Sequence, residues 1–313
     1  MRGLIITTTG SAYHVLLDSG ETIEAHVKGN FRVKGIRSTN PVAVGDYVQV
    51  EALQDGTNWI TDIEDRRNYI IRRSTNLSRE SHILAANIDQ VALIVTLQHP
   101  VTSTTFIDRF LATAEAYRVP ALLIFNKVDL LTKEQLEELN ELRSLYESLG
   151  YPTLAISALH LTQDDSHYSI LNAQLKGKVT LLSGNSGVGK STLLNALLGE
   201  EVTRTGKISD AHDKGMHTTT FSAMYPLQEP ASGWIIDTPG IKGFGAVQME
   251  KEEISHYFRE LFAIGRSCRY SNCLHTEEPG CAVHDAVVRG EISMTRYESY
   301  LSLLGDVEES KSR

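Results

Sequence analysis

Short β-prone runs broken by turn signals fill the chain from its first residue to about residue 70. Runs such as GLIITT, YHVLL and VGDYVQVEAL are rich in branched and aromatic residues, and no helical period competes with them. Five or so strands in so short a segment favour a small closed barrel of the OB-fold type, which often binds single strands and structured RNA. A barrel that only packs against its neighbour is the alternative interpretation.

From about Asp89 the pattern changes to apolar strands that alternate with helices. VALIVTL, ALLIFNK, TLAIS, KVTLLSG and GWIIDTP are expected to be buried strands. The segment KEQLEELNELRSLYESL places leucines at the spacing of a core-facing helix stripe. This alternation predicts a doubly wound α/β domain.

After about Val247 the chain becomes charged and helical, and this region contains all of the cysteines. We therefore expect three domains. They are a β-barrel over residues 1–72, an α/β domain over residues 73–246 and a mainly helical domain over residues 247–313.

Composition and charge narrow the class of protein. The net charge of −9 argues against general electrostatic adhesion to nucleic acid, so any RNA contact must use a local basic patch. The stretch RRNYIIRR offers one, with Arg66, Arg67, Arg72 and Arg73. No apolar run approaches the length of a membrane span, and the opening segment lacks the features of a signal peptide. We expect a cytosolic protein, a monomer without a membrane partner.

The stretch GNSGVGKST fits the phosphate-loop pattern, with the strand KVTLLS before it and an apolar helix after it. Its glycines let backbone N–H groups turn toward phosphate oxygens, Lys190 adds a positive charge, and Ser191 can ligate Mg²⁺ at the helix start. A glycine-rich turn without a ligand is the alternative. The expected nucleotide contacts here are Gly184, Asn185, Ser186, Gly187, Val188, Gly189, Lys190, Ser191 and Thr192.

Two switch-like segments accompany this loop. The motif DTPG ends the strand GWIID, where Asp237 can hold Mg²⁺ through water and the Gly240 amide can sense a γ-phosphate. Between the phosphate loop and DTPG lies KGMHTTT, in which Thr218 or Thr219 can complete the Mg²⁺ shell. A plain surface turn is the alternative for this segment.

A guanine-reading signature, NKVD, follows the strand ALLIF. Asp129 can accept hydrogen bonds from N1–H and the exocyclic amine of guanine, Lys127 lies along the base plane, and Asn126 ties the loop together. After the strand TLAI, Ser157 and Ala158 are the usual companions, and their loop offers a backbone N–H to guanine O6. The pattern predicts GTP, bound with Mg²⁺, in preference to ATP.

The order of these motifs is unusual, because ordinary G proteins carry the phosphate loop before the base reader. A circular permutation explains the order, since domain termini often lie close together. With the predicted barrel in front and the cysteine cluster behind, the chain resembles the bacterial small-ribosomal-subunit-dependent GTPases, the RsgA family, also called YjeQ or YloQ, over essentially its whole length. The resemblance implies a late-acting assembly factor that binds the small ribosomal subunit and its rRNA and hydrolyses GTP in response to it.

The cysteine cluster has the spacing of a metal site. Cys268, Cys273, His275 and Cys281 supply three thiolates and an imidazole, a closed tetrahedral set suited to one structural Zn²⁺ per chain. The spacing is similar to the zinc-binding pattern of the family. His284 is a possible rival for the fourth ligand, and buried free cysteines are the alternative. Four protein ligands leave no open position for water, so we assign no catalysis to this metal.

The sequence lacks the usual catalytic glutamine, because Ile241 follows the DTPG motif. We therefore expect slow intrinsic hydrolysis that a partner or another residue accelerates. His217 is the nearest substitute in sequence, and the switch of the family also carries a histidine there; a surface histidine is the alternative. Competing functions are a GTP-dependent RNA- or ribosome-binding module with incidental hydrolysis, and a P-loop ATPase or kinase. Asp129, Ser157 and Ala158 oppose the second of these.

Overall fold

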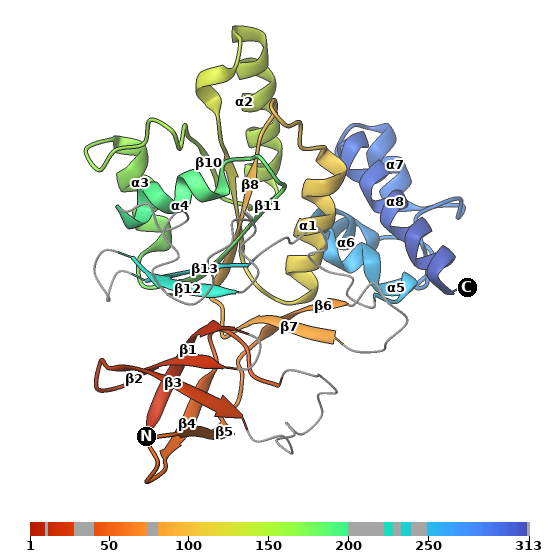
Figure 1. Cartoon of the computed structure of the whole chain (residues 1–313). Helices are drawn as coiled ribbons and strands as arrows, with labels where there is room; N and C mark the ends of the chain where they lie inside the picture. Colours follow the sequence, from red (N-terminus) through yellow and green to blue (C-terminus); the bar gives the residue numbers. More distant parts are fainter. Residues whose placement is uncertain are drawn as a thin grey trace.

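The structure is a computed structural model that describes residues 1–9, 12–27, 41–73, 81–199, 222–227, 233–238 and 249–311. A β-barrel, a central sheet covered by helices and a group of C-terminal helices follow one another along the chain (Figure 1). None of the helices in these ranges is both long enough and apolar enough to cross a lipid bilayer.

Five described strands near the N-terminus form the barrel. Their apolar residues alternate with exposed ones, so that Ile5 and Val15 point inward and are fully buried. The strands are β1 (Arg2–Thr8), β2 (Tyr13–Leu17), β3 (Thr22–Val27), β4 (Tyr47–Ala52) and β5 (Asn58–Ile63).

The pairing of these strands closes the barrel. β1 pairs with β2 and β4, β2 pairs with β3, β4 pairs with β5, and β3 runs parallel to β5. A five-stranded barrel closed in the order β1-β2-β3-β5-β4 is the predicted OB-fold arrangement, so that prediction is confirmed.

The central sheet has the order β10-β9-β8-β11-β13-β12, and β12 is antiparallel to its neighbour while the others are parallel. β8 and β9 are buried along their whole length, as expected of strands covered on both faces. The strands are β8 (Gln90–Val95), β9 (Ala121–Phe125), β10 (Thr153–Ala155), β11 (Val179–Gly184), β12 (Ala223–Pro226) and β13 (Trp234–Asp237).

Helices cover both faces of this sheet, which confirms the doubly wound α/β prediction. One face packs against α1 (Thr104–Ala116) and α2 (Lys133–Ser148), through residues such as Phe110 and Tyr146. The other face packs against α3 (Ser166–Leu175) and α4 (Lys190–Leu198). A short 3-10 turn, η1 (Val128–Leu130), follows β9.

In the described part of the chain, a strand pairing and a hairpin join the barrel to the central sheet. Thr7 of β1 pairs with Ala223 of β12, so the barrel extends the edge of the sheet. A hairpin of β6 (Tyr69–Arg73) and β7 (Ser81–Ala86) lies between the two bodies, and Ile70 and Ala85 enter the same core as α1 (Figure 1).

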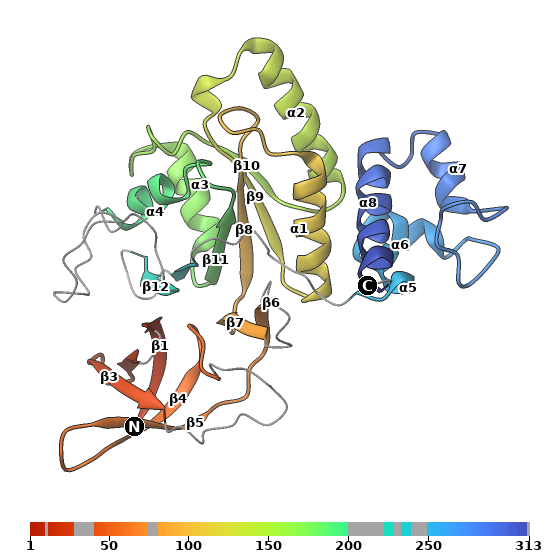
Figure 2. The same ribbon diagram turned by 45° about the vertical axis from the view of Figure 1, so that its right-hand side comes forward.

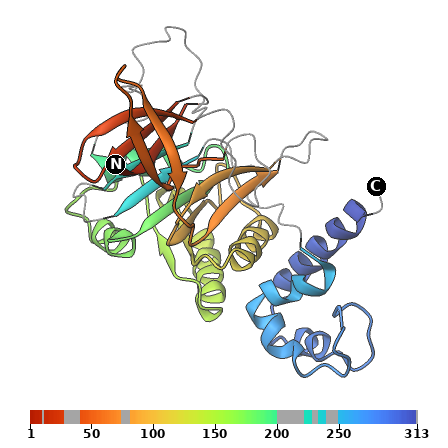
Figure 3. The same cartoon turned by 90° about the horizontal axis from the view of Figure 1, so that it is seen from below.

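The C-terminal helices form a small core of their own around Phe258, Leu261 and Tyr300. They pack beside α1 and stand apart from the barrel (Figures 2 and 3). This agrees with the predicted mainly helical region. The elements are α5 (Lys251–Ile254), η3 (Ser255–Tyr257), α6 (Arg259–Gly265), α7 (Ala282–Val288) and α8 (Met294–Lys311).

Arginines connect this helical group to the central domain. Arg296 of α8 is 1% exposed and binds Asp108 of α1 at 2.7 Å and Glu260 of α6 at 2.6 Å. Tyr146 of α2 donates to the same Asp108 carboxylate at 2.9 Å. Arg259 of α6 reaches Glu115 of α1 at 2.7 Å. The boundary between the two bodies is therefore built partly from buried charges.

Candidate functional site

The predicted phosphate loop lies where a strand end meets a helix start. Gly184 ends β11, and Gly189 directly precedes α4; both have positive φ, 156° and 94°. A Cβ at Gly184 would lie 2.7 Å from the Ile94 carbonyl oxygen, and one at Gly189 would clash with the Asn126 amide. Glycine is required at both positions, because the loop approaches neighbouring strands too closely for a side chain.

Asn126 joins three loops at the carboxyl ends of the parallel strands. It is 4% exposed, its Nδ2 donates to the Val188 carbonyl of the phosphate loop at 2.8 Å, and its Oδ1 accepts from the Ala158 N–H at 2.8 Å. One buried amide therefore fixes the NKVD loop against both the Ser157–Ala158 loop and the phosphate loop. The predicted contact between the Ala158 N–H and guanine would share or replace its bond to Asn126.

Lys127 makes a second connection between the base-reading loop and the phosphate loop. Its backbone is left-handed, with φ at 63°, and its Nζ donates to the Gly187 carbonyl at 2.7 Å and to the His99 carbonyl. Asp129 lies in η1, and its carboxylate is 3.8 Å from Nε2 of the exposed His160. The Asp129 side chain is 26% exposed, so its carboxylate is accessible beside these loops.

Of the described candidate magnesium ligands, Asp237 ends β13, and Ser191 lies at the start of α4, which follows the adjacent strand β11. Asp237 is 3% exposed, and its carboxylate contacts Nζ of Lys190. The same Nζ atom lies 3.4 Å from the carbonyl oxygen of Thr238. Ser191 and Thr192 are exposed at the start of α4. The structure thus brings the ammonium group of Lys190, the carboxylate of Asp237 and the exposed side chain of Ser191 to one edge of the sheet.

The rest of the predicted switch residues lie outside the described part of the chain. They are His217, Thr218, Thr219, Gly240 and Ile241.

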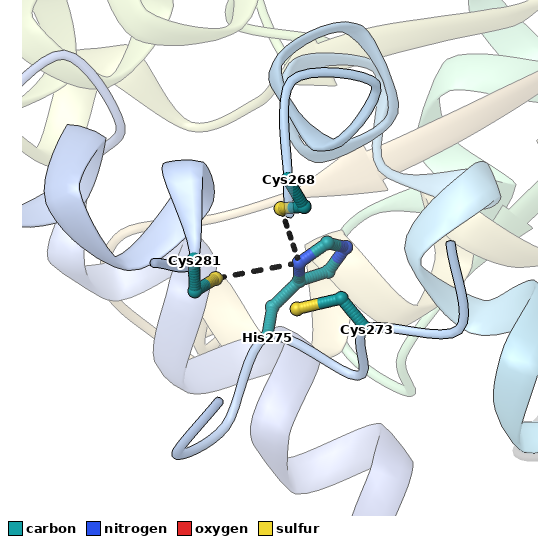
Figure 4. Close-up of side chains that lie close together, drawn as sticks. All are labelled: Cys268, Cys273, His275 and Cys281. Atoms are coloured by element: carbon teal, nitrogen blue, oxygen red, sulfur yellow. Dashed lines mark hydrogen bonds between the residues drawn. The ribbon is translucent and has the colours of Figure 1, made fainter. Parts of the chain in front are cut away.

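The metal-ligand candidates meet in the C-terminal helical group (Figure 4). The ligand atoms of Cys268, Cys273, His275 and Cys281 all lie within 4.8 Å of one another. Nδ1 of His275 is 3.5 Å from Sγ of Cys268 and 3.5 Å from Sγ of Cys281. Zn–S and Zn–N bonds of about 2.3 and 2.0 Å place sulfur and nitrogen about 3.5 Å apart in a tetrahedral site. The Cys₃His group can therefore hold a metal ion such as zinc.

Burial sets the protonation chemistry of these ligands. It raises the pKa of Cys273 to about 12, raises that of Cys281 above its ordinary value, and lowers that of His275. Each shift favours the neutral form of its group. A divalent cation reverses this preference for the thiols, because thiolates are the forms that bind metal. The rival candidate His284 is exposed, and only its backbone N–H approaches Cys281, at 3.4 Å.

Three side chains that the sequence did not single out hold the ligand loop. The carboxylate of Glu278 accepts from the backbone N–H groups of Leu274, at 2.7 Å, and Thr276, at 2.8 Å. The Tyr297 hydroxyl donates to the His275 carbonyl at 2.6 Å, and the Tyr300 hydroxyl donates to the Leu274 carbonyl. They fix His275 in a left-handed backbone conformation with φ at 57°.

The predicted basic patch divides into residues with different roles. Arg66 is 6% exposed and binds the buried Asp46 at 2.6 Å and the Pro41 carbonyl at 2.7 Å. Arg67 is 63% exposed and pairs with Asp89 at 2.8 Å. The guanidinium of Arg66 is therefore held in a buried ion pair, whereas the side chain of Arg67 is largely exposed. Arg72 and Arg73 end strand β6, and only their backbone is described.

Comparisons with known proteins agree with this geometry. The RsgA GTPase family profile matches residues 63–247, and the RsgA N-terminal domain profile matches residues 2–60. A protein of Phocaeicola vulgatus named small ribosomal subunit biogenesis GTPase RsgA is 59% identical over 313 residues, covering 100% of this chain and 99% of the relative. A Bacteroides fragilis protein with the same name is 58% identical over 313 residues, and the match covers 100% of this chain and 99% of that protein.

Solved structures show the same fold. The crystal structure of YjeQ from Thermotoga maritima superposes with a TM-score of 0.74 at 32% identity, covering 98% of each chain. The structure of YloQ, titled a circularly permuted GTPase, gives a TM-score of 0.73 at 29% identity, covering 100% of this chain and 96% of YloQ. The permuted motif order, the barrel and the matched profiles agree, and the chain belongs to the RsgA GTPase family.

Proposed function

We propose that this chain binds the small ribosomal subunit in the cytoplasm, acts late in its maturation, and hydrolyses GTP to GDP and phosphate with stimulation by the subunit. The observation that carries the GTPase part is the Asn126 amide, which holds the base-reading loop against the phosphate loop. The subunit is inferred from the full-length relatives named small ribosomal subunit biogenesis GTPase.

Guanine is selected by the loops that Asn126 joins. The exposed carboxylate of Asp129 accepts from N1–H and the exocyclic amine of the base. Lys127 covers one face of the base while its Nζ remains on the phosphate loop. The Ser157–Ala158 loop supplies a backbone N–H for O6. Adenine offers the opposite donor and acceptor pattern at these positions, so the site rejects it.

Phosphate and Mg²⁺ bind at the start of α4. Backbone N–H groups of residues 184–192 surround the phosphates, and Lys190 exchanges its contact with Asp237 for phosphate oxygens. Ser191 and one of Thr218 and Thr219 would ligate Mg²⁺, and Asp237 would hold it through water. The Gly240 amide contacts the γ-phosphate. When bound, Mg²⁺ would supply positive charge that neutralises the phosphates.

His217 positions the attacking water. Ile241 stands where many G proteins carry glutamine, and an aliphatic side chain cannot orient water. Binding to the subunit places His217 near the γ-phosphate, which makes hydrolysis dependent on the partner. His217→Ala therefore retains GTP affinity and subunit binding but loses about 10²-fold in stimulated turnover. Wild-type single-turnover rates for this variant on saturating subunits would assign catalysis to a group of the ribosome.

The remaining parts of the chain serve this reaction as separate domains, over about residues 1–72, 73–246 and 247–313. The barrel contacts rRNA, with Arg67 as its exposed cation among the described arginines of the basic patch. The Cys₃His group holds one structural Zn²⁺ that stabilises the C-terminal domain.

The test compares hydrolysis of GTP and ATP by the whole chain alone, with small subunits and with large subunits. We expect turnover of GTP to rise only with small subunits. ATP turnover equal to that of GTP would reject the base-reading assignment. Tight GTP binding with no stimulation by either subunit would indicate a binding module whose hydrolysis is incidental.

A further inference from the structure

Residues 96–103 form a connecting loop between β8 and α1, at the edge of the sheet where the nucleotide loops lie. β8 is the neighbour of both β9 and β11, which lead into the base-reading loop and the phosphate loop. A Cβ built on Gly187 of the phosphate loop would lie 3.5 Å from Cδ of Pro100. The connecting loop is therefore packed against the phosphate loop and lies within reach of both halves of the nucleotide site.

Thr96 closes the connecting loop with hydrogen bonds. It follows β8 directly and is 1% exposed, and its hydroxyl donates to the Pro100 carbonyl at 2.5 Å. Its backbone N–H donates to the Thr102 hydroxyl at 3.2 Å, and its carbonyl accepts from the Thr102 N–H at 2.9 Å. The ring of Pro100 fixes its own φ, so a bond to the Pro100 carbonyl also limits the orientation of the preceding peptide. That peptide carries the carbonyl of His99.

The carbonyl of His99 contacts the base-reading loop. His99 has a left-handed backbone, with φ at 54°, a conformation that residues other than glycine seldom adopt. Its carbonyl accepts from Nζ of Lys127, which also donates to the Gly187 carbonyl at 2.7 Å. The imidazole of His99 is exposed, and the group that His99 directs to the nucleotide loops is its backbone carbonyl.

These contacts fix the side chain of Lys127 through protein groups alone. A long, flexible lysine side chain loses conformational entropy when it is held in one geometry. Two carbonyl acceptors on different loops hold the ammonium group, and this also sets the direction of the methylene stem. A ligand that meets a side chain already in place does not have to order it, so its affinity is higher.

We propose that Thr96 is a positioning residue of the guanine site. Its hydroxyl holds the connecting loop so that the His99 carbonyl anchors Lys127, the side chain that lies along the base. Thr96 acts through Lys127 and does not touch the nucleotide. This inference rests on the base-reading role of the NKVD loop in the proposed function. A threonine that only closes the turn between β8 and α1 would contribute to stability and leave nucleotide affinity unchanged.

The test measures the affinity of the full chain for GDP in the presence of Mg²⁺ by isothermal titration calorimetry. Thr96→Val replaces the hydroxyl with a methyl group of similar size and retains both backbone bonds to Thr102. We expect it to bind GDP about fivefold more weakly, an effect in the range for loss of one hydrogen bond. Thr96→Ser retains the hydroxyl and should bind GDP within about twofold of wild type.

Thr113→Val is the matched control. Thr113 is 3% exposed, and its hydroxyl also donates to a backbone carbonyl, that of Arg109, at 2.8 Å. It lies in α1, about 15 Å along the helix from the N-cap residue Ser103. The variant should bind GDP like wild type, and thermal unfolding of both valine variants shows that the fold is retained. Equal GDP affinities for Thr96→Val and Thr113→Val would overturn the proposal.

A double-mutant cycle separates action through Lys127 from general loosening of the connecting loop. Lys127→Ala should weaken GDP binding by itself. Addition of Thr96→Val to it should change the affinity by less than about twofold, because the His99 carbonyl then has no ammonium group to hold. Additive losses in the double variant would also overturn the proposal. Wild-type affinity for Lys127→Ala would reject the base-reading role as well, whereas a loss with Lys127→Ala and none with Thr96→Val would reject only the role of Thr96.

Discussion

The nucleotide site and the metal-ligand loop are assembled in opposite ways. The nucleotide loops leave strands that are in register within one sheet, with Ile94 paired to Gly184 on one side and to Ile124 on the other. Backbone hydrogen bonds place these loops, and the buried amide of Asn126 locks them. No strand occurs in the described residues 249–311, and the side chains of Glu278, Tyr297 and Tyr300 hold the backbone of the metal-ligand loop.

This difference determines whether a substitution in each site abolishes ligand binding or the local fold. A site placed by a sheet tolerates the loss of one ligand-binding side chain without unfolding, because the strands keep their register. A loop placed by a few side chains and a metal ion loses its conformation when one of them is removed. Substitutions in the two regions should therefore separate loss of binding from loss of structure.

Removal of the metal should have the largest effect. Cys273→Ser leaves an incomplete tetrahedral set, and structural zinc contributes about 10 kcal/mol or more to the stability of small domains. We expect metal analysis of the purified variant to show less than one ion per chain, and proteolysis to cut mainly within residues 249–311.

His284→Ala is the matched control for this variant, because the His284 side chain is exposed and outside the cluster. It should retain its metal. Acid should release metal from the wild-type chain, since burial raises the pKa of the Cys273 thiol to about 12 and protons compete for the thiolates as the pH falls. Metal-free protein with an intact C-terminal region would contradict the structural role.

Asp129→Asn should remove guanine recognition while the fold stays intact. The amide offers one donor and one acceptor, which suits the carbonyl that xanthine carries in place of the amine of guanine. Affinity for GTP should fall by about 10⁴-fold, and affinity for xanthosine triphosphate should rise. Nucleotide titration measures both, with the exposed Glu138→Gln on α2 as the charge control. GTP binding at wild-type strength would place Asp129 outside the site.

Arg296→Ala should destabilise the boundary between the two regions. Arg296 is 1% exposed in the wild-type chain, and its removal leaves the carboxylates of Asp108 and Glu260 without their cation. Breaking a buried ion pair in this way costs about 3–5 kcal/mol. Burial already raises the pKa of Asp108, and Arg296 opposes that shift. Denaturant unfolding measures the loss. Arg289→Ala, which breaks an exposed pair, should cost less than about 1 kcal/mol; equal losses for the two variants would contradict the role of Arg296.

Glu278→Gln should have the smallest effect on stability, and its effect on ligand binding should be confined to the metal site. The amide retains one acceptor, so one of the two backbone N–H groups of the ligand loop loses its charged partner, at a cost of about 1–2 kcal/mol. Metal affinity should fall by about tenfold or more while GTP affinity is unchanged. A competition assay with a chromogenic chelator measures this. Unchanged metal affinity would show that Tyr297 and Tyr300 hold the loop without Glu278.

The nucleotide motifs and the metal ligands could be predicted because their chemistry depends on short, local patterns. NKVD and GNSGVGKST each follow a strand that its own apolar run reveals. Arg66 shows the limit of a local pattern, because its partner Asp46 lies 20 residues away and turns an apparent surface charge into a buried ion pair. Asp108 and Arg296 are 188 residues apart, so no motif marks their contact.

That separation along the chain also sets an order in time. During synthesis Asp108 leaves the ribosome 188 residues before Arg296, a delay of about 10 to 40 s at ordinary elongation rates. Throughout that interval Asp108 lacks the Arg296 guanidinium with which it pairs in the folded chain. Helix α8 supplies that guanidinium and packs against α1. Burial of Asp108 therefore has to wait for α8, because an unpaired carboxylate is costly to remove from water.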